Sequence, residues 1–416
     1  MEFKKVTLGE IAKFNQKSYK SNYNWKTVKY LDTGNLNKNK VENLTTFNLR
    51  KEKLPSRAKR IPQINSILYS TVRPNQEHYG ILENKFDNLL VSTGFTVIDI
   101  YKENINPKYI YYFLTKKDIT AYLQKIAEDS VSTYPAIKPS DIKNLEILLP
   151  NRNNQDKIEQ ILSNLDSKIE INNKIISNLE SQAQAIFKSW FVDFEPFQDG
   201  NFVESELGMI PKGWEVKELG EVADCKLGGT PSRKKREFWN GDIPWINSGE
   251  VNKDRIIEPS EYITEDGLKN SATKLLKRKT TLVAITGATL GQVSLLEIDC
   301  CTNQSIIGIE PNEKIPYEYI YLFIKNNINK IISNQTGAAQ QHINLNDIRT
   351  SKIIIPQSRI MTEYVKIVSL LMSKVEKNYF ENTKLAELRD ALLPKLMAGE
   401  IDVSNIKIEG EEVKNE

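Results

Sequence analysis

The sequence predicts an α+β fold with an internal pseudo-two-fold repeat, in which two globular α/β domains are separated by two long helices that pair as an antiparallel coiled coil. Two observations lead to this prediction. Five phrases recur in the same order, about 206 to 215 residues apart, and two segments carry apolar residues at alternating three- and four-residue spacing. At 416 residues the chain is also too long for a single ordinary core.

The repeated phrases mark the edges of the globular domains. The phrase "IKPSDIKNLEILLP" (137–150) returns as "INLNDIRTSKIIIP" (343–356), and "TLGEIA" (7–12) returns as "ELGEVA" (218–223). The offset drifts by a few residues, which is what small loop insertions do to a duplicated unit. A period this long does not fit a solenoid, so it indicates two copies of one module.

The repeat divides the chain into six segments. We expect globular domain 1 at 1–150, a helical arm at 151–193, a linker at 194–212, globular domain 2 at 213–356, a second helical arm at 357–400 and a disordered tail at 401–416. Short apolar runs within the domains are typical of strands. Two runs opened by proline, 106–127 and 315–333, each predict one helix.

Each helical arm carries an apolar seam, which predicts that the two arms pack against each other. The seam positions are Leu162, Leu165, Ile169, Asn172, Ile176 and Leu179 in the first arm, and Val368, Leu371, Val375, Asn378, Leu385 and Leu392 in the second. Asn172 and Asn378 occupy equivalent seam positions, where a buried polar residue would fix the register at a cost in stability. The alternative is that both asparagines face solvent.

The composition favours a soluble protein of a reducing compartment, and we expect a cytoplasmic location. Of all residues 39% are hydrophobic and 27% charged, and the net charge of +3 is too small to identify a partner by itself. Three cysteines without a CxxC motif do not form a disulfide framework. Two isolated histidines argue against a metal site, and no 18-residue apolar run predicts a membrane span.

The sequence lacks the motifs of the common catalytic sites, so we predict no catalytic residue. It contains no Gly-Lys pair for a P-loop, no adjacent prolines for an amino-methylating motif, and no GxSxG or HExxH. Asp141 and Asp347 recur at equivalent positions of the repeated phrase, and we interpret them as structural. An enzyme with an unrecognised site remains an alternative.

Basic and aromatic residues alternate in runs at the predicted loops of both domains, which indicates a binding surface for nucleic acid. The main runs are 15–26 and 50–60 in domain 1 and 226–239 in domain 2. The last run contains four consecutive cations within "SRKKR". Two glycines before them, Gly228 and Gly229, allow close backbone approach. Each run taken alone also fits an ordinary solvated face.

Several phrases, taken together, resemble the specificity subunit of type I restriction-modification systems. These are "LGEIA" and "LGEVA", "KLGGTPS", "IPWINSGEV", "TGATLG", "TNQSI", "AQAIFKSWFVDFEPF" and "LAELRDALLPKLMAGEIDV", which span nearly the whole chain. Domain 1 departs from the pattern, because it has "STVRPNQEHYG" where domain 2 has "AITGATLGQVS".

The resemblance implies a non-catalytic subunit in which each domain recognises one half of a split, asymmetric site in double-stranded DNA. The helices would set the spacing between the halves and dock two modification (methyltransferase) subunits. Two restriction (motor-nuclease) subunits would complete the complex. S-adenosylmethionine, ATP and Mg²⁺ would belong to those partners, with no cofactor or metal in this chain and no role for a membrane.

Within this interpretation we predict which side chains contact DNA. In domain 1 they are Lys20, Asn35, Arg57, Arg60 and Arg73. In domain 2 they are Lys226, Thr230, Ser232, Arg233, Lys234, Arg236, Asn247, Thr289, Gln340 and Gln341. A different class remains open, namely a two-domain coiled-coil adaptor that binds protein and has no DNA specificity.

Overall fold

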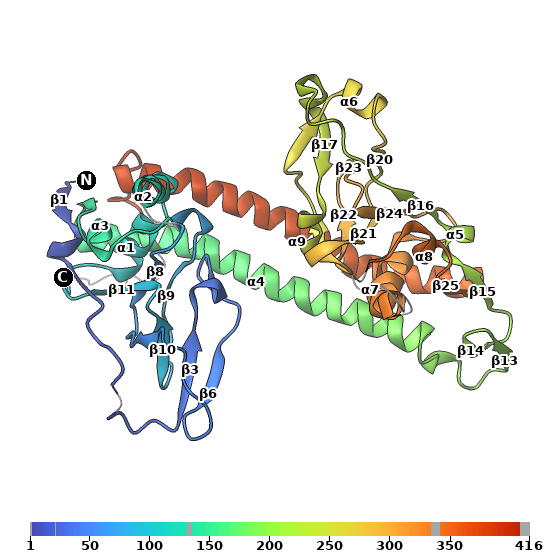
Figure 1. The fold of residues 1–416 in the computed structure, drawn as a ribbon, viewed down its shortest axis with the longest axis horizontal. Coiled ribbons are helices and arrows are strands. Elements are labelled where there is room, and N and C mark those ends of the chain that lie inside the picture. The colour runs from blue at the N-terminus through green and yellow to red at the C-terminus, as the bar shows by residue number, and fades with distance from the viewer. Residues whose placement is uncertain (1, 21, 131–134, 334–341, 408–416) are drawn as a thin grey trace. The chain divides into compact units, whose positions relative to one another are not determined.

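The structure is a computed structural model that describes residues 2–20, 22–130, 135–333 and 342–407. It divides into two compact units, of which unit 1 comprises Met1–Lys168 and Leu385–Glu416 and unit 2 comprises Ile169–Lys384 (Figure 1). The long helices α4 (Arg152–Phe191) and α9 (Ser358–Ala398) each contribute to both units. Each unit therefore holds one globular domain and a stretch of both helices.

The two long helices run antiparallel within each unit, as the sequence predicts. In unit 1, Lys157 near the start of α4 bonds the carbonyl of Ser404, while Asp166 further along pairs with Arg389 at 2.7 Å. In unit 2, Asn172 bonds Asn382, and Phe187 meets Tyr364 with ring centroids 6.5 Å apart. As the residue number rises along α4, the number of its partner falls.

The described residues of domain 1 form two four-stranded sheets and three α-helices. The sheet orders are β2-β11-β8-β9, which lies beside α1, and β6-β3-β10-β7, while β1 pairs with β12 and β4 with β5 (Figure 1). The strands are β1 (Lys4–Thr7), β2 (Ala12–Phe14), β3 (Thr27–Leu31), β4 (Leu36–Asn37), β5 (Lys40–Val41), β6 (Thr45–Asn48), β7 (Ala58–Arg60), β8 (Ile67–Ser70), β9 (Tyr79–Ile81), β10 (Leu89–Ser92), β11 (Phe95–Ile100) and β12 (Glu146–Leu149); the helices are α1 (Pro107–Leu114), α2 (Lys117–Asp129) and α3 (Pro139–Lys143).

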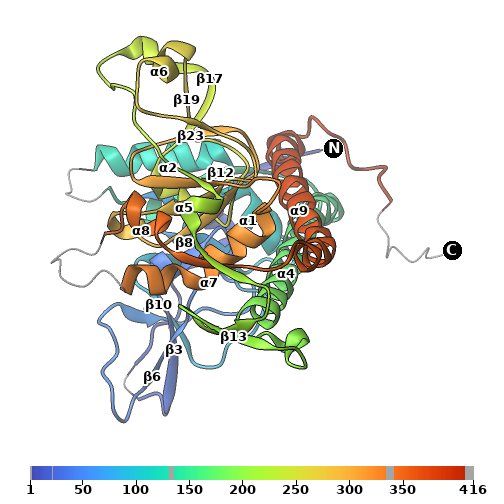
Figure 2. The ribbon, with the colours of Figure 1, turned by 90° about the vertical axis from the view of Figure 1, so that its right-hand side faces the viewer.

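Domain 2 repeats this plan. Its sheet orders are β16-β24-β21-β22-β18 and β19-β17-β23-β20, and β15 pairs with β25; the second sheet and α6 project away from α7 and α8 (Figure 2). The strands are β15 (Glu215–Glu218), β16 (Asp224–Leu227), β17 (Trp239–Ile246), β18 (Arg255–Ile256), β19 (Glu261–Ile263), β20 (Leu275–Leu276), β21 (Thr281–Ala284), β22 (Val293–Leu296), β23 (Cys300–Thr302), β24 (Ile306–Glu310) and β25 (Lys352–Ile355); the helices are α5 (Leu219–Val222), α6 (Glu265–Lys269), α7 (Tyr317–Ser333) and α8 (Leu345–Arg349).

The repeated phrases form the same junction in both domains. The strand pair β1·β12 corresponds to β15·β25, and both pairs are antiparallel over four residues. In the first, Asp141 accepts a hydrogen bond from the Lys138 amide at 2.7 Å. In the second, Asp347 accepts one from the Asn344 amide, also at 2.7 Å. Both aspartates satisfy a free amide at a helix start, which accounts for their recurrence.

Ion pairs cross each of these strand pairs. Lys5 of β1 lies 2.6 Å from Glu146 of β12, and Lys352 of β25 lies 3.5 Å from Glu218 of β15. The basic residue stands on the first strand in one domain and on the last strand in the other. The two junctions therefore share a backbone pattern but carry opposite charge patterns.

Repeated glycines make room for the basic residue at the end of the short junction helix. A Cβ atom on Gly9 would lie 2.7 Å from the Lys143 side chain, and one on Gly220 would lie 3.0 Å from the Arg349 side chain. Arg349 also donates to the carbonyl of Cys225 at 2.9 Å. The "LGE" phrase is therefore part of the packing between the first and last elements of each domain.

The predicted seam residues all lie on the buried or half-buried side of the helices. Leu162, Asn172, Ile176, Val368, Val375 and Asn378 are buried, while Leu165, Ile169, Leu179, Leu371, Leu385 and Leu392 are half-buried. In unit 2 the seam continues into a core that includes Phe187, Phe191 and Tyr364. In unit 1 it continues into a core that includes Leu393 and Leu396.

Asn172 and Asn378 are both buried, so the solvent-facing alternative is wrong. Asn172 is fully buried, and its amide group donates to Glu381 and to Asn382, both at 2.9 Å. The Asn172 amide oxygen and the Asn378 amide nitrogen have no hydrogen-bond partner among the described residues. A buried polar atom without a partner lowers the stability of the folded state.

Three segments differ in detail from the prediction. The run 106–127 forms two helices, because the chain turns out of α1 at Thr115, whose amide and hydroxyl both bond the Tyr112 carbonyl. The 194–212 segment contains a hairpin of β13 (Phe202–Ser205) and β14 (Gly208–Pro211). At the start of the 401–416 tail, Val403 is fully buried in the core of unit 1, and residues 408–416 lie outside the described residues.

Replacing Asn172 and Asn378 together with leucine should raise the melting temperature of unit 2 by about 2–4 °C, the shift that ~1 kcal/mol produces in a folding unit of roughly 200 residues. Removing the two unpartnered buried atoms and adding apolar contact both favour the folded state. Thermal unfolding followed by circular dichroism measures the change. The exposed residue Asn178, replaced with leucine, is the control. An unchanged or lower melting temperature would contradict the stated cost of the buried asparagines.

Candidate nucleic-acid interface

In domain 2, several loops meet around the turn between β23 and β24. The Gly229 amide bonds the Thr302 carbonyl at 2.8 Å, and the Thr230 hydroxyl bonds the Gln304 side chain at 2.6 Å. The Asn303 amide bonds the carbonyl of Ile246 at the end of β17. Hydrogen bonds therefore join the loops that follow β16, β17 and β23 to one another, with Thr230 and Gln304 exposed.

The two glycines of the "KLGG" phrase are required by this close packing. A Cβ atom on Gly228 would lie 2.2 Å from the Asn303 carbonyl oxygen, and one on Gly229 would lie 2.5 Å from the Thr273 amide nitrogen. The carbonyl of Gly229 in turn accepts a hydrogen bond from the buried Trp245 indole at 3.1 Å. The glycines thus hold the loop against the body of the domain.

Arg233 is fixed on an aromatic surface. Its guanidinium carbon lies 3.6 Å from the ring centroid of Trp239, and its two terminal nitrogens bond the Glu261 carboxylate at 2.9 and 2.6 Å. The Trp239 indole donates to the Ser232 carbonyl at 3.3 Å. This arrangement orders the start of the "SRKKR" run.

The remaining cations of that run have different surroundings. Lys235 lies 4.7 Å from the Phe238 ring centroid. Lys234 and Arg236 are exposed, and neither side chain bonds another residue in the part of the chain that the structure describes. Two of the predicted DNA contacts are therefore available beside an ordered arginine.

Other predicted contacts of domain 2 take part in the fold. Lys226 pairs with Glu310 and with Asp224, and the hydrogen bond that it donates to Glu310 raises the pKa of Lys226 above its usual value. The Asn247 side chain accepts a bond from the Gly249 amide at 2.8 Å, and Thr289 bonds the carbonyl of Thr286 at 3.4 Å. Gln340 and Gln341 lie outside the described residues.

Domain 1 gathers its loops at the start of β11, the strand that corresponds to β24. The Thr71 amide bonds the Gly94 carbonyl and the Asn15 amide bonds the Val97 carbonyl, both at 2.8 Å. A Cβ atom on Gly94 would lie 2.8 Å from the Thr33 side chain. In both domains, therefore, polar loops are hydrogen-bonded to one another near the start of the corresponding strands β11 and β24.

The five predicted contacts of domain 1 differ in their surroundings. Lys20 and Arg57 are exposed, and Asn35 is half-buried in a 3₁₀ turn. Arg73 is exposed and has a positive φ of 47°, and its amide bonds the Pro135 carbonyl. Arg60 points into the domain, where it donates to Asn15 at 2.6 Å and to the Phe95 carbonyl, and burial lowers its pKa.

The structure adds residues that are absent from the predicted contacts. Tyr19, Tyr23 and Trp25, within the basic and aromatic run 15–26, form an aromatic cluster next to Lys20, with ring centroids 5.1 to 5.6 Å apart. Gln304, in the "TNQSI" phrase, is exposed and accepts a hydrogen bond from the Thr230 hydroxyl at 2.6 Å. The phrase itself was the only sequence signal for Gln304.

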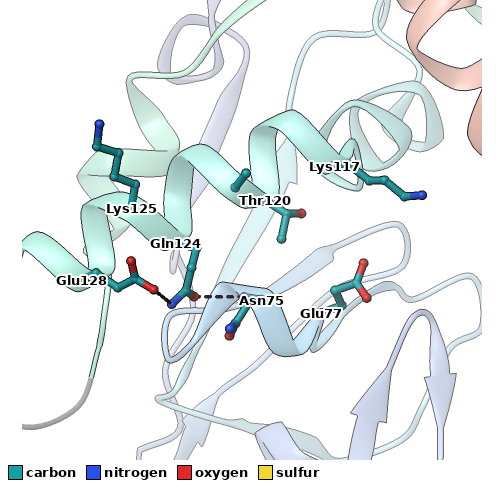
Figure 3. A pocket seen from close by; sticks show the side chains of 8 residues that line it. Asn75, Glu77, Lys117, Thr120, Gln124, Lys125 and Glu128 are labelled. Carbon is teal, nitrogen blue, oxygen red and sulfur yellow. Dashed lines mark hydrogen bonds between the residues drawn. The ribbon is translucent and has the colours of Figure 1, made fainter. Parts of the chain in front are cut away.

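A pocket of about 370 Å³ lies between α2 and the 3₁₀ turn Pro74–Gln76 of domain 1 (Figure 3). Gln124 bridges its two sides, since its side chain accepts from the Asn75 amide at 3.1 Å and donates to Glu128 at 2.7 Å. The side chains that line the pocket are Asn75, Glu77, Lys117, Thr120, Gln124, Lys125 and Glu128, together with Ala121. The residues that line it include no His, Cys or Ser. We interpret the pocket as a gap in the packing of α2 against the 70–80 loop, which the bond from the Asn75 amide to Gln124 holds in place.

The thiols and carboxylates offer no catalytic arrangement in the described ranges. Burial raises the pKa of Cys225 to about 12 and that of Cys301 to about 11, so both stay protonated near neutral pH. No group of three or more His, Cys, Asp or Glu residues with metal-binding geometry occurs among the described residues. None of the helices in that part of the chain is both long and apolar enough to cross a membrane.

Comparisons with known proteins agree with this arrangement of two similar domains and two helices. The profile of the type I restriction modification DNA specificity domain matches residues 1–181 and again residues 211–389. The HindI specificity subunit of Haemophilus influenzae is 30% identical over 96% of this chain and 100% of the relative. The MjaIX specificity subunit of Methanocaldococcus jannaschii is 33% identical over 76% of this chain and 74% of the relative.

A solved structure shows the same fold. The S subunit of a type I restriction-modification system from M. genitalium aligns with a TM-score of 0.56 at 17% identity, covering 95% of this chain and 96% of that one. The chain belongs to the family of type I restriction-modification specificity subunits. Family membership does not favour the adaptor alternative.

Replacing Gly228 or Gly229 with alanine should destabilise the protein by about 1–3 kcal/mol, because the added methyl group meets backbone atoms that cannot swing away. The measurement is chemical denaturation of the purified chain. Gly34 is the control, since a Cβ atom there meets nothing within 4 Å. Equal stability of the Gly34→Ala and Gly228→Ala variants would contradict the close packing of this turn.

Proposed function

We propose that the chain reads a bipartite, asymmetric site in double-stranded DNA, with one half-site for each domain. One observation supports this most strongly: the same frame of strands and junctions occurs twice, while the loops it carries differ. At equivalent places domain 1 has Arg73 and Pro74, and domain 2 has Gly287 and Ala288. Two different loop sets on one frame fit the recognition of two different short sequences.

The polar loop surfaces are the proposed contact sites. In domain 2 the surface combines the exposed cations Lys234 and Arg236 with the side chains of Thr230 and Gln304. Cations contribute affinity through phosphates, while amide and hydroxyl groups can read base edges. In domain 1 we assign the contacts to Lys20, Asn35, Arg57 and Arg73, and we regard Arg60 as a support for these loops.

The partners follow from the proposed role. We propose that the long helices dock two modification subunits that methylate adenine, and that two motor-nuclease subunits complete a restriction complex. S-adenosylmethionine, ATP and Mg²⁺ would be held by those subunits, and this chain would hold no cofactor. The relatives are named as specificity subunits of type I restriction enzymes, which supports this division of labour.

Exchanging residues 213–356 for the matching domain of a relative with a known target should change one half-site only. The other half-site and the spacer should stay, because domain 1 and both helices are untouched. Sequencing the methylated adenines of a host that carries the chimera with its modification subunits gives the answer. The reciprocal exchange of residues 1–150 is the matched control. If one exchange altered both half-sites, independent reading by each domain would be excluded.

Replacing Lys234 and Arg236 together with alanine should weaken DNA binding and reduce the slope of log affinity against log salt by about two, close to 0.9 for each lost phosphate contact. Titration of duplex DNA at several salt concentrations measures the slope. Lys174 and Arg359, exposed on α4 and α9, supply a control with the same change in charge. If both double variants showed the same slope of log affinity against log salt, the "SRKKR" run would be an ordinary solvated surface and not a DNA contact.

A further inference from the structure

Directional polar contacts join domain 2 to the long helices within unit 2. Glu376 of α9 accepts hydrogen bonds from Arg278 and from Lys279 of domain 2, the latter at 2.8 Å. Lys279 also pairs with the fully buried Glu297. The chain segment that leads into β21 is therefore attached to α9 at a defined point.

A buried arginine connects the same domain to both helices. The Arg255 side chain is fully buried and pairs with Glu297. Glu180 of α4 lies 3.7 Å from its Nε atom, and Met372 of α9 lies 3.4 Å from one terminal nitrogen. Because a buried guanidinium is costly without such partners, it resists any movement of the domain that would separate them.

Domain 1 has its own set of contacts with the helices in unit 1. The Tyr112 hydroxyl of α1 donates to Asp166 of α4 at 2.7 Å, and Asp166 also pairs with Arg389 of α9. Lys117 of α2 lies 3.0 Å from Asp390 of α9. Different residues thus perform the same task in the two domains.

We propose that these contacts between domains and helices are positioning contacts that set how strictly the chain measures the spacer between its two half-sites. The inference rests on the bipartite reading proposed above. One added base pair rotates a half-site by about 35° and shifts it by about 3.4 Å. A domain that could rotate on its helices would still bind the displaced half-site. A domain held in one orientation would not bind it.

The type of interaction supports this role. Apolar packing between domain and helix depends on buried area and has little directional preference. Hydrogen bonds and paired charges depend on direction and distance, so they oppose rotation of the domain. These contacts lie on the helix side of each domain and involve none of the predicted DNA contacts. Weakening them should therefore change the accepted spacer length and leave the half-site sequences intact.

Two double variants weaken the contacts, Tyr112→Phe with Lys117→Gln in unit 1 and Glu180→Gln with Glu376→Gln in unit 2, where the glutamines lose the negative charge of the carboxylates. Tyr79→Phe is the matched control, because Tyr79 and Tyr112 are equally buried, at 5% exposure of Tyr79 and 5% of Tyr112, and both donate to a carboxylate. The partner of Tyr79 is Glu77, 3.2 Å away in the same domain, so its loss leaves the helix contacts untouched.

The full complex of this chain with its modification subunits is expressed in a host, and methylated adenines are sequenced. In the double variants, methylation at sites with a spacer one base pair longer or shorter should rise about ten-fold relative to the native spacing, as a loss of ~1.4 kcal/mol of discrimination implies. Both half-site sequences should stay the same, and Tyr79→Phe should behave as the unchanged chain.

Three outcomes would overturn the inference. One is an unchanged spacer preference in both double variants, and another is a changed base within a half-site. The third is loss of methylation at every spacer while the complex still assembles, since the contacts would then serve stability alone. If the unchanged chain itself methylates no bipartite motif, the proposed function fails, and this result is separate from the other three.

Discussion

The mutual burial of the α4 and α9 seams is the constraint on which the rest of this structure depends. Each helix carries a narrow apolar stripe between polar faces, and such a stripe cannot be buried by one helix alone. The antiparallel arrangement solves this within each unit and brings one end of each helix into a domain core. Phe187 and Phe191 of α4 meet Tyr319 and Tyr364 in this way in unit 2. The helix pair thus contributes side chains to the core of each domain as well as carrying the domain.

The residues that build the frame and those that could read a target are well separated. Repeated residues such as Asp141, Asp347, Gly9 and Gly220 all serve the junctions, where they satisfy amides or allow close approach. The loops at β11 and β24 differ between the domains, although the strands beneath them correspond. A fixed frame with exchangeable loops lets specificity change without a new fold.

The repeat, the fold class and the antiparallel helices could be predicted because they rest on spacing and periodicity within the chain. The helix break at Thr115 could not, because the surrounding run is helical by pattern and the turn is stabilised by local bonds that the pattern does not reveal. The seam position of Asn172 made burial one of two alternatives, and the structure decides for burial.

The residues of the candidate site were harder to predict from the sequence than the fold. Arg60 and Lys226 look like surface cations in the sequence, yet their partners Asn15 and Glu310 stand 45 and 84 positions away in the chain. Arg233 is similarly paired with Glu261, 28 positions on. Composition identifies a basic run, but only the tertiary structure shows which of its members are already engaged and which remain available.

The opposite charge patterns of the two junctions have a consequence for folding. A duplicated chain risks pairing the first strand of one copy with the last strand of the other. In the same register, pairing β15 with β12 would place Glu218 opposite Glu146, whereas pairing β1 with β25 would place Lys352 opposite Thr7 and diagonal to Lys5. Like charges opposite each other destabilise a strand pair. The glutamates Glu218 and Glu146 therefore disfavour the pairing of β15 with β12, which the shared backbone pattern alone would permit.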